Sequence, residues 1–222
     1  MSDATAPSSV ARLERTIRSV GFSPEVPAAR TLLLIIALAG ALYGACMGTF
    51  AFEFGQRTLM VLYAAIKVPL LISLTTLLCL PGFFVFNTLA GLRDDFNTSL
   101  RSILASQGAF TLTLASLGPI TMFVYTSGVN HRWALLFNAV CFSIATLFAQ
   151  LVLIRRYKSL IATNARHRAM LVIWVTLYAF VGIQMGWMMR PFVGNPAKEV
   201  TFFRDEPFSN AYVAVFNLVT KR

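Results

Sequence analysis

One lysine stands where a charged side chain could bind an anion inside a membrane. Lys67 is the only basic residue well inside an apolar run, two residues before Pro69, and no acid lies deep in any such run. An ammonium group in hydrocarbon is costly unless it faces a cavity or a partner, so Lys67 with Pro69 is a candidate functional site. If its helix begins later than expected, Lys67 instead extends its ammonium to the membrane surface.

A second pattern suits close contact between helices. Gly40, Gly44 and Gly48 are spaced four residues apart in an apolar segment, so they share one helix face. Such a face lets another backbone approach closely, and van der Waals contact then stabilises the helix pair in lipid. The pattern fits two interpretations, which are packing against another helix of the same chain and an interface with a partner or a second copy.

Polar, aromatic and basic residues lie close together near the end of the last long apolar run. Gln184 can donate and accept hydrogen bonds between helices, with Asn138 and Gln150 as candidate partners. Trp187 and Arg190 suit the membrane surface, where an aromatic ring and a long cationic side chain are both stable. The group therefore predicts a structural belt or a substrate site.

The usual arrangements of catalytic and metal-binding residues are missing from the sequence. The only histidines, His131 and His167, lie in different loops, and neither belongs to a metal-binding pair motif. Cys46, Cys79 and Cys141 are isolated within apolar runs, where cysteine behaves as a small hydrophobic residue. We therefore expect neither an enzyme nor a protein that holds a cofactor or metal.

Composition indicates which elements carry these residues. Of the 222 residues 57% are hydrophobic and 13% are charged, and the mean hydropathy is +0.68. Too few charges are present to cover such an apolar chain in water, so much of its surface must face lipid. The sequence predicts an all-α membrane protein, a bundle of five transmembrane helices near residues 31–52, 58–92, 103–125, 133–154 and 170–189. Prolines predict a kink in the second, with a bend or an end at Pro81.

Polar segments flank the five predicted spans. Residues 1–30 contain a short amphipathic helix with Val10, Leu13, Ile17 and Val20 on one face. It suits either the lipid headgroup region or packing on the protein's own loops. Residues 191–222 form a polar tail, with a second interfacial helix expected from about Pro207.

Positive charge is unevenly divided between the two sides of the predicted bundle. The N-terminal side carries 11 Lys and Arg and the opposite side carries 7. Because cytoplasmic loops collect these residues, we expect a cytoplasmic N-terminus and an extracytoplasmic C-terminus, in a bacterial inner membrane. The most basic loop suits anionic lipids, and we expect no nucleic-acid binding. That loop holds Arg155, Arg156, Lys158, Arg166 and Arg168.

Several short motifs resemble those of bacterial members of the Yip1-like family of small multipass membrane proteins. They are Lys67-Val68-Pro69, the Leu-rich run from Leu78 to Pro81 with Asn87 and Gly91, and Gln184, Trp187 and Arg190-Pro191-Phe192. The resemblance implies a five-helix fold and a non-enzymatic membrane role without a defined substrate. The acidic cytoplasmic motif of eukaryotic Yip1 proteins is absent, so the resemblance does not extend to vesicle trafficking or a GTPase partner.

Two functions follow as hypotheses. The first is a non-enzymatic scaffold or accessory subunit of a membrane complex, which contacts the lipid bilayer and other membrane proteins or a second copy of itself. The alternative is a small transporter or channel for an anionic solute, with Lys67 and the prolines along its pathway.

Overall fold

The computed structural model describes residues 9–21, 26–52, 58–195, 197 and 199–203. Helices are the regular elements of this part of the chain, as predicted. They are α1 (Ser9–Gly21), α2 (Ala29–Gly48), α3 (Thr58–Leu89), the short 3-10 helix η1 (Arg93–Asp95), α4 (Phe96–Thr126), α5 (His131–Thr163) and α6 (Arg166–Met188). The helix expected from about Pro207 lies outside the described residues.

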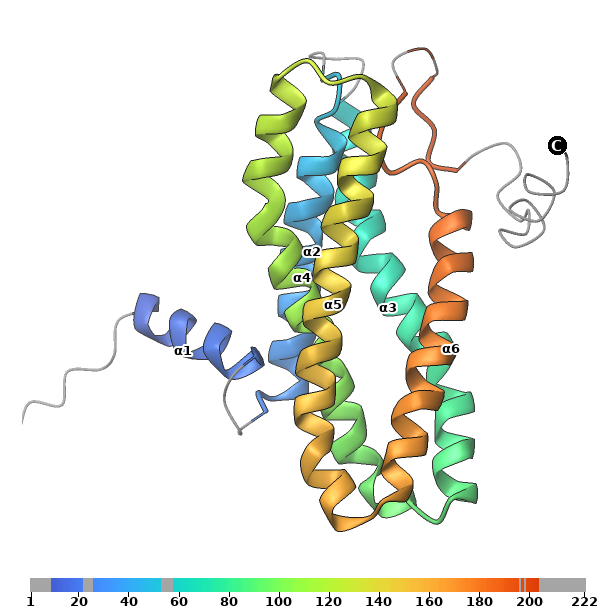
Figure 1. Cartoon of the computed structure of the whole chain (residues 1–222). Coiled ribbons are helices and arrows are strands. Elements are labelled where there is room, and N and C mark those ends of the chain that lie inside the picture. Colours follow the sequence, from blue (N-terminus) through green and yellow to red (C-terminus); the bar gives the residue numbers. More distant parts are fainter. Residues whose placement is uncertain (1–8, 22–25, 53–57, 196, 198, 204–222) are drawn as a thin grey trace, which may run out of the picture.

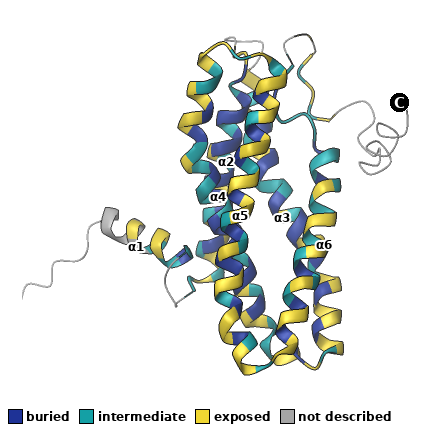
Figure 2. Ribbon diagram, viewed as in Figure 1, coloured by how far each residue is buried: buried dark blue, intermediate teal, exposed yellow. Residues whose placement is uncertain are grey.

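The five helices α2 to α6 are long and apolar enough to cross a bilayer, and they form one upright bundle (Figure 1). Large apolar side chains remain exposed on these helices. Figure 2 shows exposed residues along the length of the bundle. In a bilayer such faces meet lipid, whereas water would disfavour a patch of that extent. The chain is therefore an integral membrane protein with an all-α fold.

Packing within the bundle is uneven. Helix α2 packs tightly against α3 and α4, and α4 packs against α5. Helix α6 packs mainly against α3 and less against α5, although only Asn164 and Ala165 join α5 to α6. The two helices diverge away from this connection (Figure 1).

Helix α3 continues through both of its prolines. Pro69 and Pro81 lie inside the helix, which ends at Leu89 before Gly91 adopts a positive φ of 73°. The expectation that the helix could end at Pro81 is therefore wrong. Each proline removes only one backbone donor, and the surrounding turns keep the helix intact because hydrocarbon offers unpaired peptide groups no other partner.

Helices α4 and α5 extend further than their apolar runs predicted. Helix α4 begins at Phe96 rather than near 103, and α5 continues to Thr163 rather than ending near 154. These extensions are amphipathic and bury Ser99, Tyr157 and Leu160 between helices. Helix α2 ends at Gly48, before the predicted limit at 52, and α6 covers Arg166–Met188 rather than 170–189.

The amphipathic helix α1 touches the bundle at its C-terminal end, and the rest of it projects sideways (Figure 1). Val20 is fully buried, and a Cβ on Gly108 of α4 would lie 3.3 Å from its Cγ1. Arg156 of α5 donates to the carbonyl oxygens of Ser19 and Val20 at 2.8 and 2.7 Å. Helix α1 is therefore attached to the bundle through its C-terminal residues, and its N-terminal part projects from the side of the bundle.

Candidate functional site

Lys67 lies inside the bundle, about 13 Å along α3 from its first residue at the usual helical rise. Its side chain is fully buried, and Nζ donates a hydrogen bond to the Pro191 carbonyl oxygen at 2.7 Å. Helix α3 begins at Thr58, as expected, so the later start on which the alternative position of Lys67 depended is not observed. The segment that follows α6 covers the ammonium group and supplies its partner.

Aromatic rings complete the surroundings of Lys67. Its Nζ lies 4.8 Å from the ring centroid of Phe202 and 6.0 Å from that of Phe192. The negative face of an aromatic ring attracts a cation, most strongly where water is excluded. Among the described residues Lys67 has no carboxylate partner. The observed contacts therefore attach the chain after α6 to α3, and Lys67 does not line an open path.

The three glycines of α2 face α3. A Cβ on Gly44 would lie 2.2 Å from the carbonyl oxygen of Ala64, and one on Gly48 would lie 2.4 Å from Cα of Val61. At Gly40 the nearest atoms belong to Pro69, at 3.3 Å. The glycines thus serve packing within the chain, and a partner could use this face only by displacing α3.

Asn138 takes part in a hydrogen-bond network near the end of the bundle that holds the α4–α5 connection. It accepts from the Tyr43 hydroxyl at 2.9 Å and donates to the Tyr125 hydroxyl and to the Ala134 carbonyl oxygen. These bonds join α2, α4 and α5. The suggested pairing of Asn138 with Gln184 is therefore wrong, because tyrosines of the neighbouring helices satisfy the amide instead.

Trp187 and Arg190 lie together at the end of α6. The Arg190 guanidinium stacks 3.1 Å from the centroid of the Trp187 ring, and its Nε donates to the Trp187 carbonyl oxygen at 3.0 Å. Gln184 lies half-buried one turn earlier on the same helix. Stacking of this kind holds a cation against an apolar surface. The stacked pair is compatible with both predicted roles, a structural belt and a substrate site.

The opposite end of the bundle carries most of the exposed basic residues. Seven Lys and Arg lie there beside two Asp, on the helix ends and connections between α3 and α4 and between α5 and α6; the basic residues are Arg93, Arg101, Arg155, Arg156, Lys158, Arg166 and Arg168. One of the acids, Asp95, pairs with the buried Nε2 of His167 at 3.0 Å and links η1 to α6. We call these seven residues the basic end.

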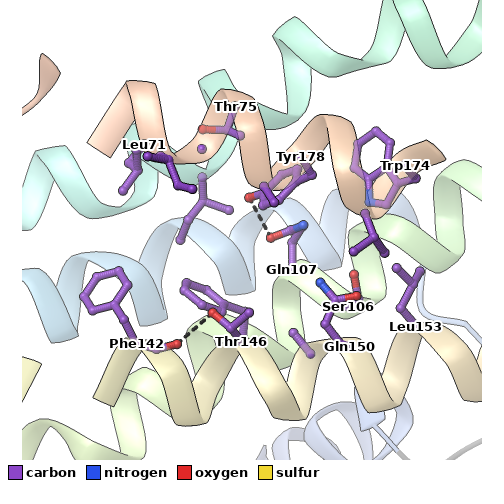
Figure 3. Close-up of a pocket in the computed structure, with 17 residues that line it drawn as sticks. Leu71, Thr75, Ser106, Gln107, Phe142, Thr146, Gln150, Leu153, Trp174 and Tyr178 are labelled. Carbon is purple, nitrogen blue, oxygen red and sulfur yellow. Dashed lines mark hydrogen bonds between the residues drawn. The ribbon is translucent and has the colours of Figure 1, made fainter. Parts of the chain in front are cut away.

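A cavity of about 440 Å³ lies between α3, α4, α5 and α6, and sequence reasoning did not find it. Figure 3 shows Tyr178 of α6 donating to Gln107 of α4 at 3.0 Å beside Thr75 of α3. Gln150, expected to pair with Gln184, lies in the cavity wall. Single polar residues in apolar runs are common in membrane helices, so nothing in the sequence distinguishes these from ordinary packing residues.

The described residues contain no cluster of three His, Cys, Asp or Glu that could hold a metal ion. Comparisons of the chain with protein-family models, with curated proteins and with solved structures gave no match.

Proposed function

We propose that the chain is a non-enzymatic scaffold or accessory subunit of a membrane complex, and that its basic end binds an acidic partner in the cytoplasm. The observation that carries this proposal is the position and exposure of the basic end. Six of its seven basic side chains are exposed, and the seventh, Arg156, attaches α1. A surface of one charge sign attracts partners of the opposite sign and orients them as they approach.

The lengths of the helices support this placement. Helix α2 has 20 residues, whereas α3, α4 and α5 have 32, 31 and 33. A hydrocarbon core needs about 20 residues of helix, so the longer helices extend beyond it. Four of the basic residues lie on such extensions, and the other three lie at the adjoining connections, so they are within reach of a soluble protein or of anionic lipid headgroups.

Orientation is part of the same proposal. Lys and Arg collect in cytoplasmic loops, so the basic end belongs in the cytoplasm and the end with Arg132 outside. A bacterial inner membrane fits this rule. We further propose membership of the Yip1-like family, supported by the short motifs around Lys67 and after Gln184 and by the five-helix architecture that the family resemblance implies.

The test is purification from native membranes in a mild detergent, with identification and quantification of the proteins recovered. Lys158→Gln with Arg168→Gln should lower recovery of a stoichiometric partner several-fold, and moderate salt should do the same, because exposed charges are screened. Arg132→Gln, at the other end of the bundle, is the control and should leave recovery unchanged. Equal recovery from both variants, or a strictly monomeric wild-type protein, would contradict the proposal.

Transport of an anionic solute through Lys67 is the second candidate. The observation that favours it is a buried ammonium whose partners in the described chain are a carbonyl oxygen and two rings, which leaves two of its three donors for an anion. Transport would require the chain from Pro191 to Phe202 to move away. Flux of anions into vesicles that is lost in Lys67→Met would support it, and unchanged flux would exclude this role for Lys67.

A further inference from the structure

The cavity between α3, α4, α5 and α6 has the dimensions of a ligand site. Its volume of about 440 Å³ lies within the range of small-molecule pockets. The cavity exists because α6 packs along α3 and diverges from α5 with distance from the segment that joins α5 to α6. Ile183 is 57% exposed at its edge, so the cavity is bordered by a surface that faces lipid.

Polar atoms in the wall can hold a hydrogen-bonding group. Tyr178 uses the carbonyl oxygen of Gln107, which leaves the amide nitrogen of Gln107 as a donor. Thr75 is 1% exposed, and its hydroxyl has no hydrogen-bond partner among the described residues. Buried polar groups are almost always paired, so an unpaired hydroxyl in a cavity wall indicates a missing partner.

The chemistry of the wall restricts the ligand. None of the 17 lining residues is charged. A charged group would lose its hydration there without gaining a counter-charge, so the ligand's polar group must be neutral. The remaining wall is built from apolar and aromatic side chains such as Leu71, Phe142 and Trp174, which suit a hydrocarbon chain or ring.

The direction of the cavity also follows from its lining. Gln107 lies next to Gly108, which faces Val20 of α1 and Leu32 near the start of α2. The hydrogen-bonding group is therefore close to the level where α1 meets the bundle. Leu71 and Phe142 line the end of the cavity nearer the starts of α3 and α5, Leu153 and Trp174 line the other end, and Gln107 lies between them (Figure 3). The space between Gln107 and Leu71 suits an amphiphile whose polar group lies at Gln107 and whose apolar chain extends towards Leu71 and Phe142.

We propose that this cavity binds an uncharged amphiphile, with an alcohol, ester or ketone group at Thr75 and Gln107 and an apolar chain towards Leu71, and that the ligand enters from the bilayer between α5 and α6. The site is independent of the proposed scaffold function. Two kinds of molecule share this chemistry, which are a neutral glycerolipid and a quinone with an isoprenoid or alkyl chain.

Trp174 provides the readout, because it lines the cavity and is 1% exposed. With Trp133→Phe and Trp187→Phe it becomes the only tryptophan. In lipid nanodiscs, a dibrominated monoacylglycerol should quench its fluorescence in a saturable manner, whereas brominated phosphatidylcholine as the bulk lipid should not. Competition by unlabelled monoolein and by decylubiquinone then compares the affinities of a neutral glycerolipid and a quinone. The competitor that binds more tightly identifies the natural class of ligand.

Two glycines of α6 give a matched pair of variants. A Cβ on Gly182 would meet Cγ2 of Thr75 at 3.6 Å, an ordinary contact, so Gly182→Leu should fold and fill the cavity. A Cβ on Gly186, one turn later, would meet nothing within 4 Å, so Gly186→Leu should leave the cavity open. Saturable quenching should disappear in the first variant and persist in the second.

Removal of the polar groups tests the hydrogen bonds separately. Thr75→Val with Gln107→Leu should weaken monoacylglycerol binding about tenfold, in line with the loss of one or two buried hydrogen bonds. Oleate, which carries a charged head on the same chain, should compete at least tenfold more weakly than monoolein. Non-saturable quenching, equal quenching in Gly182→Leu and Gly186→Leu, or oleate that competes as well as monoolein would overturn the proposal.

Discussion

Gly44 determines how closely α2 and α3 approach each other. The site of its missing Cβ is occupied by backbone atoms of Ala64 and Ala65, which cannot move away as a flexible side chain can. Helix association in lipid depends on such contacts, because burial of apolar surface provides no driving force between helices already in hydrocarbon. One methyl group at this position must therefore separate the two helices.

We expect Gly44→Ala to destabilise the bundle by about 3 kcal/mol, the upper part of the usual range for an overpacked core. Gly186→Ala is the control, because a Cβ there meets open space and alanine is the better helix former. Thermal unfolding in a mild detergent measures both. A Gly44→Ala protein as stable as wild type would show that α2 and α3 do not pack as described.

The surroundings of Lys67 show what a sequence can and cannot predict about a single residue. Its position in a long apolar run was enough to predict an unusual site, because an intramembrane charge is rare. Its partners could not be predicted, since the Pro191 carbonyl lies 124 residues away and a carbonyl oxygen is common to every residue. The hydrogen bond between Tyr178 and Gln107 could not be predicted for the same reason, because only the fold brings α4 and α6 together.

At the level of elements, α1 is attached to the bundle by the buried Val20 and by one arginine of α5. The guanidinium of Arg156 donates to two carbonyl oxygens at the C-terminal end of α1, which also places positive charge where the helix dipole is negative. Arg155 precedes it on α5 and is exposed. The two neighbours therefore have the same charge and different roles.

We expect Arg156→Gln to release α1 and to accelerate trypsin cleavage after Arg18 about tenfold, since two charge-assisted hydrogen bonds are lost. Arg155→Gln should leave the cleavage rate unchanged. Mass spectrometry of the early fragments follows the reaction. Equal rates in both variants would show that other contacts, such as burial of Val20, hold α1 in place.

Helix limits show where a hydropathy pattern stops being informative. The apolar runs predicted five spans, and the described residues contain five helices that are long and apolar enough to cross a membrane. The predicted ends were too early on α5 and too late on α2, because hydropathy marks lipid contact whereas helices end where backbone hydrogen bonding ends. Tyr157 and Leu160 continue the buried face of α5 beyond Arg155 and Arg156, so the helix continues with them.

At the scale of the whole molecule, the two ends of the bundle differ in charge. The basic end lies opposite the end that holds Arg132 and the chain after α6. The proposed orientation, with the basic end in the cytoplasm, would explain this asymmetry and would place α1 at the inner surface of the membrane.

This orientation can be measured with two exposed positions, Ala162 and Ser127, changed singly to cysteine after replacement of the three buried native cysteines by alanine. A membrane-impermeant maleimide should label Ser127→Cys in intact cells. Ala162→Cys should react only after permeabilisation. The reverse pattern would contradict the orientation and, with it, a cytoplasmic partner at the basic end.

Photocrosslinking in living cells tests most directly the proposal that the basic end docks an acidic cytoplasmic partner. A photoreactive amino acid at Lys158 should give one dominant protein adduct, which weakens several-fold with Arg155→Gln and Arg168→Gln in the same chain. The same probe at Arg132, on the other end, should not give that adduct. Equal adducts from both positions, or an adduct at Lys158 that the charge changes leave intact, would contradict the claim.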